Sequence, residues 1–364
     1  MFLVPRCYRP EKINFAGKYE QLSRDAEGHI FTLSGQRARN LQIASFSFHA
    51  QSDSKSFLVR NLRRFWIQAI LPAVLLWKGP RVDAVIAYDP FSSGLAGVIL
   101  KVVLRTRLIV EINGDYHRMD FSKGLAKRWV GKRVFWQCVK RCDALKVVNK
   151  DQEHFYRRRF PDKAVYRFPD YVASKYFSSL ETYQGDYLLS VGHPFGLKGV
   201  DILIKSFTRI TNRNNKMKLR IMGYCPEGEM AVYKNLARDN PKIEFVKAGW
   251  IEDVAEQMRG CYAVVSASRT EAASRIMFEA MASKKAIVAT KTNSGMNYVE
   301  DNCTGLLVEI NDADDLANKL EYLVNNPERA HEMGMAGFKK LIKDYSEKKY
   351  LQSFVHMVEQ ICQS

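Results

Sequence analysis

Two acidic side chains in the second half of the sequence are candidates for binding a ligand. Glu279 stands in the apolar run FEAMA at positions 278–282, and Glu271 lies eight positions earlier in a polar segment. A buried carboxylate is destabilising unless a polar group meets it, so a hydroxyl-bearing ligand would explain Glu279. Alternatively, Glu271 stabilises a helix N-terminus and Glu279 pairs with Lys284 or Lys285. The residues alone leave both interpretations open.

A second candidate for chemistry is the glycine-containing segment SVGHPFGLKGVD at positions 190–201. Its pattern predicts a strand, a loop and then a helix. Small residues let backbone amides approach a phosphate, the helix N-terminus adds a positive dipole end, and Lys198 supplies a full charge. Gly223 and Tyr224 follow another predicted strand. Each loop by itself is also explained as an ordinary turn.

The elements that would position these loops are short apolar strands alternating with helical segments. In the first half the strands are predicted at the N-terminus and at 82–88, 107–112 and 144–148. In the second half they are predicted at 187–191, 219–222, 243–246, 263–266, 286–289 and 305–308. Such alternation predicts two doubly wound α/β domains with parallel sheets, divided near residues 168–170. Because ligands bind at the carboxyl ends of parallel strands, the expected active site is a cleft between the domains.

Length and composition agree with two globular domains. The chain has 364 residues, more than one core usually organises, and 46% of them are hydrophobic. Its seven cysteines form no C-x-x-C pair, which indicates neither a disulfide framework nor a zinc site. The opening MFLVPR breaks after three apolar residues, too few for a secretory signal. We therefore predict a first β-strand there and a cytoplasmic protein.

The net charge of +17 is confined to one half of the chain. Residues 1–180 hold 32 Lys/Arg and 15 Asp/Glu, whereas residues 181–364 hold 24 of each. A basic half implies an anionic partner, which could be a phospholipid surface, a diphospholipid acceptor or a nucleic acid. No helix-turn-helix, zinc or RNA-binding signature occurs in the sequence, so nucleic acid is not the expected partner.

Two segments of the basic half bear on a membrane partner. The apolar run at 65–77 contains Pro72 and is too short to span a bilayer, and a core helix is favoured there over an interfacial one. Segment 123–141 interleaves Lys and Arg with apolar residues at three- and four-residue spacing. It is the better candidate for a membrane-surface helix, although a core helix with a solvated basic side fits equally well.

Five features in order resemble the retaining glycosyltransferases of family 4, which have the GT-B fold. They are the loop at 191–201, the Glu271-x7-Glu279 spacing, EAMA at 279–282, the strand at 286–290 and GLLV at 305–308. The resemblance is close over about residues 187–345 and looser before them. It implies an acceptor-side Rossmann-like domain over residues 1–170 and a nucleotide-sugar-binding one over 171–345. A C-terminal helix at 346–364 would pack back on the first domain.

By this resemblance the catalytic residues are Glu271, Asn113 and Lys198. Glu271 would hold hydroxyls of the donor sugar, and Lys198, assisted by Arg275 or Arg269, would neutralise the diphosphate. The implied donor-binding residues are Glu279 at the ribose, with Gly192, His193, Lys198, Gly223, Tyr224, Ile251, Ala273, Ser274, Arg275 and Ile276. The chain departs from the family at His193, which replaces an arginine, at 272–274, which replaces Gly-Phe-Gly, and at Asn113, which replaces a histidine.

The resemblance implies transfer of a sugar, with retained configuration, from a nucleoside-diphosphate sugar to a saccharide or lipid-linked saccharide. Its natural setting is surface-polysaccharide (O-antigen or capsule) synthesis at the inner face of the cytoplasmic membrane, with an anionic membrane surface as partner. No cofactor and no metal are expected, because no Asp-x-Asp pair is placed to hold a divalent ion, and Asp312 to Asp315 come late in the fold. The alternatives are a sugar-nucleotide epimerase of the same architecture and, less favoured, a basic nucleic-acid-binding protein.

Overall fold

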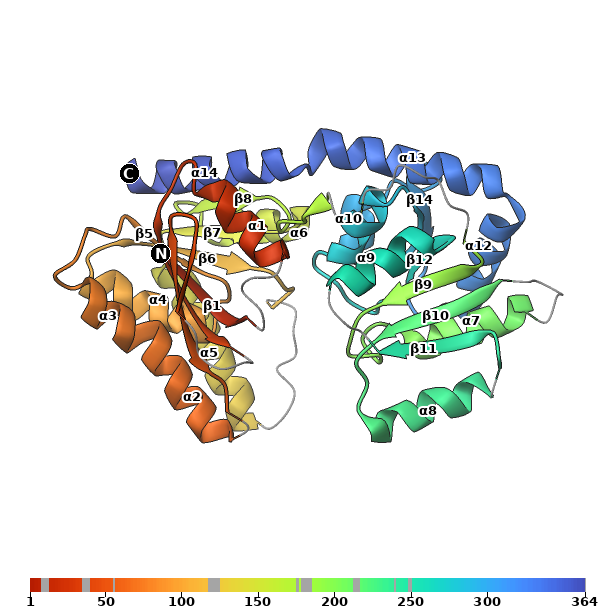
Figure 1. Cartoon of the computed structure of the whole chain (residues 1–364), viewed down its shortest axis with the longest axis horizontal. Coiled ribbons are helices and arrows are strands. Elements are labelled where there is room, and N and C mark those ends of the chain that lie inside the picture. Colours follow the sequence, from red (N-terminus) through yellow and green to blue (C-terminus); the bar gives the residue numbers. More distant parts are fainter. Residues whose placement is uncertain are drawn as a thin grey trace. The chain divides into compact units, whose positions relative to one another are not determined.

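The computed structural model describes residues 1–7, 13–34, 40–54, 56–116, 125–174, 177, 185–211, 217–238, 240–247 and 251–363. These residues form two compact units, each with its own sheet (Figure 1). Unit 1 comprises Met1–Tyr171 and Lys348–Ser364, and unit 2 comprises Val172–Glu347.

Unit 1 is built on an eight-stranded sheet in the order β3-β4-β2-β1-β5-β6-β7-β8. All neighbouring strands are parallel except β3, which runs antiparallel to β4. The strands are β1 (Phe2–Cys7), β2 (Gly28–Ser34), β3 (Leu41–Ile43), β4 (Phe46–Ser52), β5 (Ala84–Ala87), β6 (Arg107–Ile112), β7 (Ala144–Val147) and β8 (Ala164–Arg167). The sequence predicted β1, β5, β6 and β7 but gave no sign of the other four.

Helices cover both faces of this sheet. They are α1 (Ile13–Leu22), α2 (Phe57–Phe65), the π-helical turn η1 (Trp66–Ile70), α3 (Leu71–Leu76), α4 (Ser92–Val103), α5 (Leu125–Arg141), α6 (Lys150–Arg159) and α14 (Glu347–Gln363). Side chains of η1, α4 and α5 share one core with alternate residues of the strands, as the pleat requires. On the other face, Phe2 of β1 packs against Tyr19 of α1 and Phe354 of α14, with ring centroids 4.9 and 5.7 Å apart.

The segment predicted as a core helix at 65–77 is part of a longer helix. Residues of α2, η1 and α3 follow one another with helical backbone angles throughout. Ile67 and Ala69 are buried, but Phe65 and Trp77 are 47% and 65% exposed. The prediction of a core helix is therefore right for one face of this helix and wrong for the other. Among the residues listed above as described, no helix is long and apolar enough to cross a membrane.

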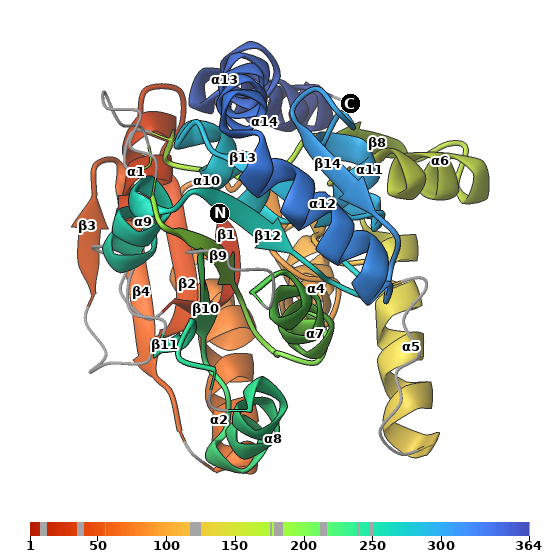
Figure 2. The same ribbon diagram turned by 90° about the vertical axis from the view of Figure 1, so that its right-hand side faces the viewer.

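Unit 2 contains a six-stranded parallel sheet in the order β11-β10-β9-β12-β13-β14. Its strands are β9 (Tyr187–Val191), β10 (Lys218–Gly223), β11 (Ile243–Lys247), β12 (Ala263–Ser266), β13 (Ala286–Thr290) and β14 (Gly305–Val308). Its helices are α7 (Val200–Thr211), α8 (Glu227–Ala237), α9 (Ile251–Gly260), α10 (Arg275–Ala282), α11 (Asn293–Tyr298), α12 (Ala313–Asn325) and α13 (Pro327–Asp344). Helices α7 and α12 share a core on one face, and α9 and α10 pack on the other (Figure 2).

The strand order of unit 2 creates a topological switch point. From β9 the chain moves to β10 and β11 on one side of the sheet, and then crosses to β12 on the other side of β9. The loops that follow β9 and β12 therefore leave the same edge in opposite directions, and a crevice forms where they separate. The predicted fold class, two doubly wound Rossmann-like domains, is confirmed.

Candidate functional site

Glycines determine the path of the loop after β9. Gly192 has φ +142° and Gly199 has φ +63°, values that side chains disfavour. A Cβ atom at Gly199 would clash with the carbonyl oxygen of Ala267, and one at Gly223 would clash with the carbonyl oxygen of Gly192. The aliphatic stem of Lys198 lies directly against Gly192. The loop can therefore approach its neighbours only with glycine at these positions, and the position of Lys198 follows from that path.

Lys198 and Glu271 meet at the switch point of unit 2. Nζ of Lys198 lies 2.6 Å from Oε1 of Glu271, and the two side chains are 22% and 13% exposed. The other carboxylate oxygen, Oε2, is buried and has no hydrogen-bond partner among the described residues. A buried hydrogen-bond acceptor without a donor destabilises the folded protein. A ligand hydroxyl that donates to Oε2 would remove this penalty.

Arg269 ties the loop after β9 to the loop after β12. Its guanidinium donates to both carboxylate oxygens of Asp201, at 2.9 and 2.8 Å. Its backbone N–H donates to the carbonyl oxygen of Leu197 at 2.9 Å. Burial acts to raise the pKa of Asp201, but the hydrogen bonds from Arg269 outweigh it and lower that pKa. The Arg269 guanidinium, one of the cations considered for the phosphate, is thus bound within the protein.

Glu279 lies inside α10, and its side chain is 5% exposed. Its ion-pair partner is Arg275, at 3.0 Å one turn earlier, and not Lys284 or Lys285 as one interpretation of the sequence had it. Burial raises the pKa of Glu279, and Arg275 counteracts the shift only in part. Because Arg275 is itself 57% exposed, the buried carboxylate depends on a partner that can turn towards solvent or a ligand.

The helix that carries Glu279 begins four residues after Glu271. Ser274 is its N-cap residue and is buried, and the backbone N–H of Ser274 donates to Oγ of Ser294 at 2.6 Å. The first amides of an α-helix have no partner within the helix and favour an anion. Residues 273–276, predicted from the resemblance to face the sugar and phosphate, therefore include the N-terminus of this helix.

The structure brings most of the predicted donor-site residues to three adjacent strand ends. Gly192, His193 and Lys198 follow β9, Gly223 ends β10 and Tyr224 follows it, and residues 271–276 follow β12. The order of these strands is β10-β9-β12. His193 is exposed, and the Tyr224 side chain is 62% exposed. Ile251 begins α9, but its side chain lies outside the described residues, so that prediction has no structural counterpart.

Asn113 belongs to unit 1 and follows β6. Its Nδ2 donates to the carbonyl oxygen of Tyr88 and to Oε2 of Glu111, both at 3.3 Å, and its Oδ1 accepts from Nζ of Lys146 at 3.2 Å. Lys146 is fully buried, lies 3.6 Å from Glu111 and also pairs with Asp170. Burial by itself would lower the pKa of Lys146, but Asp170 and Glu111 outweigh it and raise the pKa.

The sequence interpretation missed Lys146 and Glu111. Both interrupt runs that were predicted as buried strands, at 144–148 and 107–112. A charge in such a run needs a partner of opposite sign, so the two interruptions were a usable signal for an ion pair between neighbouring strands.

The late acidic segment has a structural role. Oδ1 of Asp312 accepts from the backbone N–H groups of Asp314 and Asp315, both at 2.9 Å, which caps the N-terminus of α12. Within the described part of the chain, no group of three or more His, Cys, Asp or Glu side chains is arranged to hold a metal ion.

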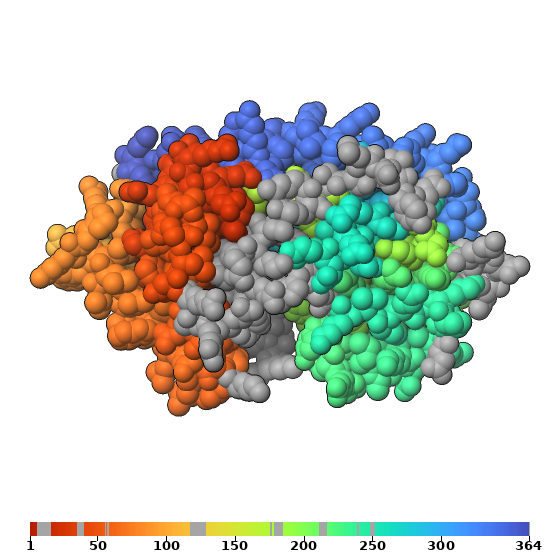
Figure 3. Space-filling view, in the orientation of Figure 1, coloured from red at the N-terminus to blue at the C-terminus, as the bar shows by residue number. Residues whose placement is uncertain are grey.

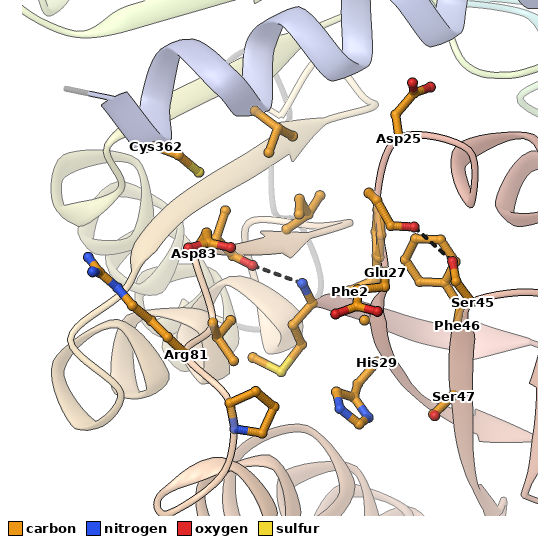
Figure 4. Close-up of a pocket in the computed structure, with 18 of the residues that line it drawn as sticks. Phe2, Asp25, Glu27, His29, Ser45, Phe46, Ser47, Arg81, Asp83 and Cys362 are labelled. Atoms are coloured by element: carbon orange, nitrogen blue, oxygen red, sulfur yellow. Dashed lines mark hydrogen bonds between the residues drawn. The ribbon is translucent and has the colours of Figure 1, made fainter.

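A cavity of about 590 Å³ opens in unit 1 (Figure 4). Its walls include Gly28 and His29 at the start of β2, Asp83 before β5 and Cys362 in α14. Ligands of open α/β sheets bind at the carboxyl ends of the strands, and this cavity lies at the amino ends. We therefore do not assign the donor to it.

Comparisons with known proteins agree with this geometry. Residues 175–340 match the family model "Glycosyl transferases group 1". An uncharacterized glycosyltransferase of Methanocaldococcus jannaschii is 24% identical over 99% of this chain and 98% of its own length.

Two solved structures have the same fold. Sucrose-phosphate synthase of Thermosynechococcus elongatus is 16% identical, with a TM-score of 0.80 over 99% of this chain and 98% of that one. Anabaena HepE in complex with UDP-glucose is 12% identical, with a TM-score of 0.73 over 99% of this chain and all of that one. The expected resemblance is confirmed at the level of the group 1 type, while membership of family 4 stays a prediction. Residues 175–340 match the group 1 glycosyltransferases, and the chain has the GT-B fold of glycosyltransferases.

Proposed function

We propose that this glycosyltransferase moves a sugar from a nucleoside-diphosphate sugar to a hydroxyl acceptor, with retained configuration and with the donor bound by unit 2. The observation that carries the proposal is the Lys198–Glu271 pair with the unpartnered Oε2 of Glu271. A diphosphate offers anionic oxygens for Lys198, and the attached sugar offers hydroxyls for Glu271. One ligand can thus satisfy both members of the pair.

The remaining contacts of the donor are assigned from the same three strand ends. Glu279 would accept hydrogen bonds from the ribose hydroxyls, and the exposed ring of Tyr224 would contact the nucleotide. The diphosphate would lie near the backbone of Gly192 and Gly223, beside His193. The amides of Ala273, Arg275 and Ile276 would donate to phosphate or sugar oxygens, while the amide of Ser274 donates to Oγ of Ser294. Because HepE is a structural neighbour with bound UDP-glucose, UDP and its sugars are the first probes to use.

In the proposed reaction, the bond between the anomeric carbon and the diphosphate oxygen breaks. Negative charge grows on the leaving diphosphate, where Lys198 and the amides at the start of α10 stabilise it. The sugar gains oxocarbenium character, and Glu271 holds its hydroxyls in place. The acceptor hydroxyl then bonds through its oxygen to the anomeric carbon on the face that the diphosphate leaves, and its proton passes to the departing diphosphate oxygen, so the configuration is retained. Asn113, the remaining residue of the proposed catalytic set, could accept a hydrogen bond from a sugar hydroxyl through the second lone pair of Oδ1.

We further propose that the reaction needs no metal ion, because Lys198 supplies the positive charge at the diphosphate. Activity with UDP-glucose should then survive an excess of chelator. Activity that is lost and then restored by magnesium or manganese would contradict this part of the proposal.

The acceptor is proposed to be a saccharide or lipid-linked saccharide of surface-polysaccharide synthesis at the inner face of the cytoplasmic membrane. The support for this is the charge of the chain: the excess of cations lies within residues 1–180, which form most of unit 1. A diphospholipid-linked acceptor and the leaflet that holds it are both anionic.

The proposal is tested by calorimetry with UDP, UDP-glucose, UDP-N-acetylglucosamine, GDP-mannose and ADP-glucose. Wild type should bind at least one nucleotide sugar, and Glu279→Ala should bind the same compound at least tenfold more weakly, since a buried charged hydrogen bond is lost. Glu256→Ala is the matched control, because Glu256 is exposed on α9. Equal affinity in wild type and Glu279→Ala, or conversion of the nucleotide sugar to an epimer without acceptor, would contradict the proposal.

A further inference from the structure

The helix over residues 57–76 of unit 1 has apolar side chains on two opposite faces. Its inner face is anchored in the core, where Gln68 donates through Nε2 to the carbonyl oxygen of Val4 at 2.9 Å and to Oγ of Ser93 at 3.2 Å. We include Trp77, the residue after the helix, in its outer face. This face exposes eight large apolar side chains: Leu58, Val59, Leu62, Phe65, Trp66, Val74, Leu75 and Trp77. They are between 38% and 69% exposed. An all-round apolar helix is expected to be buried on every side, and this one is covered on one side only.

The π-helical turn keeps this outer face in one line. The backbone N–H of Leu71 donates to Trp66, five residues earlier, and Pro72 follows with no N–H to offer. Positions four apart drift by about 40° per step in a plain α-helix. A π-turn holds more residues per turn and offsets part of that drift. Leu58, Leu62, Trp66 and Val74, separated by multiples of four, therefore stay on the solvent side.

The charges within residues 54–82 have one sign, although Asp53 and Asp83 flank this segment and Oδ1 of Asp53 lies 3.2 Å from Nε of Arg60 in an ion pair. Residues 54–82 contain six cations and no Asp or Glu. The cations are Lys55, Arg60, Arg63, Arg64, Lys78 and Arg81. They lie before, within and after the apolar stretch, and Lys78 and Arg81 are exposed. Cations beside exposed Trp, Phe and Leu are the combination that anionic lipid headgroups and the acyl boundary below them attract.

We propose that the outer face of the 57–77 segment docks unit 1 on an anionic phospholipid membrane, with the helix lying in the plane of the surface. This rests on the proposed function for its setting, since a lipid-linked acceptor must be met at a bilayer. The space-filling view shows the orange segment that contains this helix open on the surface of unit 1 (Figure 3). Lipid is favoured over a second protein chain because the exposed cations Lys78 and Arg81 follow the exposed Trp77, and residues 54–82 contain no acidic side chain.

This assignment replaces the one that the sequence favoured. Helix α5, within segment 123–141, buries Phe135 and Val139 and exposes Trp129 and Val130 among its described side chains. It therefore contributes fewer exposed apolar residues than the 57–77 segment. Both α5 and η1 pack against α4, so α5 is a neighbour of the docking helix, and it is the comparison that the test needs.

The first test measures co-sedimentation with vesicles of phosphatidylglycerol and phosphatidylcholine. Trp66→Ser with Trp77→Ser in one chain should weaken binding at least tenfold, because two apolar side chains leave the bilayer. Val232→Ser with Ile342→Ser is the matched control, since these side chains are similarly exposed on unit 2. Lys78→Gln and Arg81→Gln should each weaken binding about fivefold on the anionic vesicles only. Melting temperatures should stay at the wild-type value, which shows that the variants fold.

The second test is spectroscopic and keeps the apolar surface intact. Trp66→Phe with Trp77→Phe should bind vesicles like wild type but lose most of the quenching by brominated lipid. If Trp129→Phe removes the quenching instead, α5 makes the contact and the proposal is wrong. Vesicle binding that survives Trp66→Ser with Trp77→Ser also overturns it. The proposal is also overturned if sedimentation shows that the wild type is a dimer and that these substitutions dissociate it. The outer face would then be an interface between two copies of the chain.

The two proposals fail separately. Glu279→Ala should bind vesicles as wild type does, because Glu279 lies in unit 2. Vesicle binding without any nucleotide-sugar binding would contradict the proposed function and leave the docking helix standing. Nucleotide-sugar binding without vesicle binding would contradict the docking helix and leave the proposed function standing.

Discussion

Both units place a lysine–glutamate pair at the carboxyl edge of a parallel sheet, and the two pairs differ in how much solvent they meet. Lys146 and Glu111 of unit 1 are 0% and 1% exposed, whereas Lys198 and Glu271 of unit 2 are 22% and 13% exposed. In each pair one carboxylate oxygen is buried without a hydrogen-bond partner among the described residues. The enclosed pair holds the amide of Asn113, and the partly open pair is where a ligand can enter. The same chemistry thus serves as a scaffold in one unit and as a candidate binding site in the other.

The largest effect is expected when the enclosed pair is broken. Lys146→Met leaves Glu111 as a buried charge without its partner, which should lower the free energy of unfolding of unit 1 by about 3–5 kcal/mol. Four of the five tryptophans, at positions 66, 77, 129 and 136, belong to unit 1, so denaturation followed by tryptophan fluorescence reports mainly on this unit.

The control for Lys146→Met is the double variant with Glu111→Gln, which also removes the charge that would be left. It should recover a large part of the lost stability. A double variant that is as unstable as the sum of the two single ones would show that the pair does not act as a unit.

Breaking the open pair should affect ligand binding more than folding. Lys198→Ala should lower the affinity for UDP by about 1.5–3 kcal/mol, or roughly 10- to 150-fold, because a charged hydrogen bond to the diphosphate is lost. The affinity for uridine should be unchanged, and calorimetry with both compounds separates these effects. Lys205→Ala, exposed on α7, is the matched control. An unchanged preference for UDP over uridine in Lys198→Ala would place the diphosphate elsewhere.

A smaller effect is expected from the backbone that carries Lys198. Gly199→Ala places a side chain at φ +63° and against the carbonyl oxygen of Ala267, which should destabilise unit 2 by about 1–3 kcal/mol. Gly228→Ala is the matched change, because a Cβ there meets no atom within 4 Å and the residue lies in α8. It should stabilise the protein by about 0.5–1 kcal/mol. Thermal unfolding followed by circular dichroism measures both, and equal shifts would contradict the clash.

The smallest predicted effect concerns Glu279 and depends on pH. Burial raises the pKa of Glu279 in the folded protein, so the protonated form favours folding, and this contribution is lost as pH rises through the folded pKa. The glutamine of Glu279→Gln cannot ionise, so this variant does not lose that contribution. Without ligand, its melting temperature minus that of wild type should therefore increase as the pH is raised from acid to neutral. Its affinity for UDP should fall about tenfold. A melting difference that shrinks towards neutral pH would contradict the direction of the shift.

The strands that were predicted correctly are those that stand out in the sequence as short apolar runs. β12 and β13 are short apolar runs flanked by polar turns, and the structure has them at 263–266 and 286–290. β2 and β4 were missed, although FSFHAQS alternates apolar and polar residues, which is itself a strand pattern. GHIFTLS lacks this alternation, and its parallel pairing with β4 is what identifies it as a strand. The first loop of the fold, at 8–12, lies outside the described residues.

The same distinction holds for the candidate site. The segments with Lys198, Glu271 and Glu279 could be found because their glycines and carboxylates recur at informative spacing within short stretches. The pairing of Glu279 with Arg275 was missed although it is local, since residues four apart in a helix are neighbours. The pairing of Arg269 with Asp201, 68 residues away in the chain, could not be found, because it depends on the strand order, which local sequence does not encode.

The return of α14 to unit 1 sets an order of assembly during synthesis. Tyr350 and Phe354 of α14 lie beside Lys18, Phe2 and Phe168 in the core of unit 1. When residues 1–171 have left the ribosome, that core still lacks these two rings. Residues 172–347 emerge next and hold every strand of the second sheet. The unit that is made first is therefore completed last, and until α14 emerges its aromatic surface is open to chaperones.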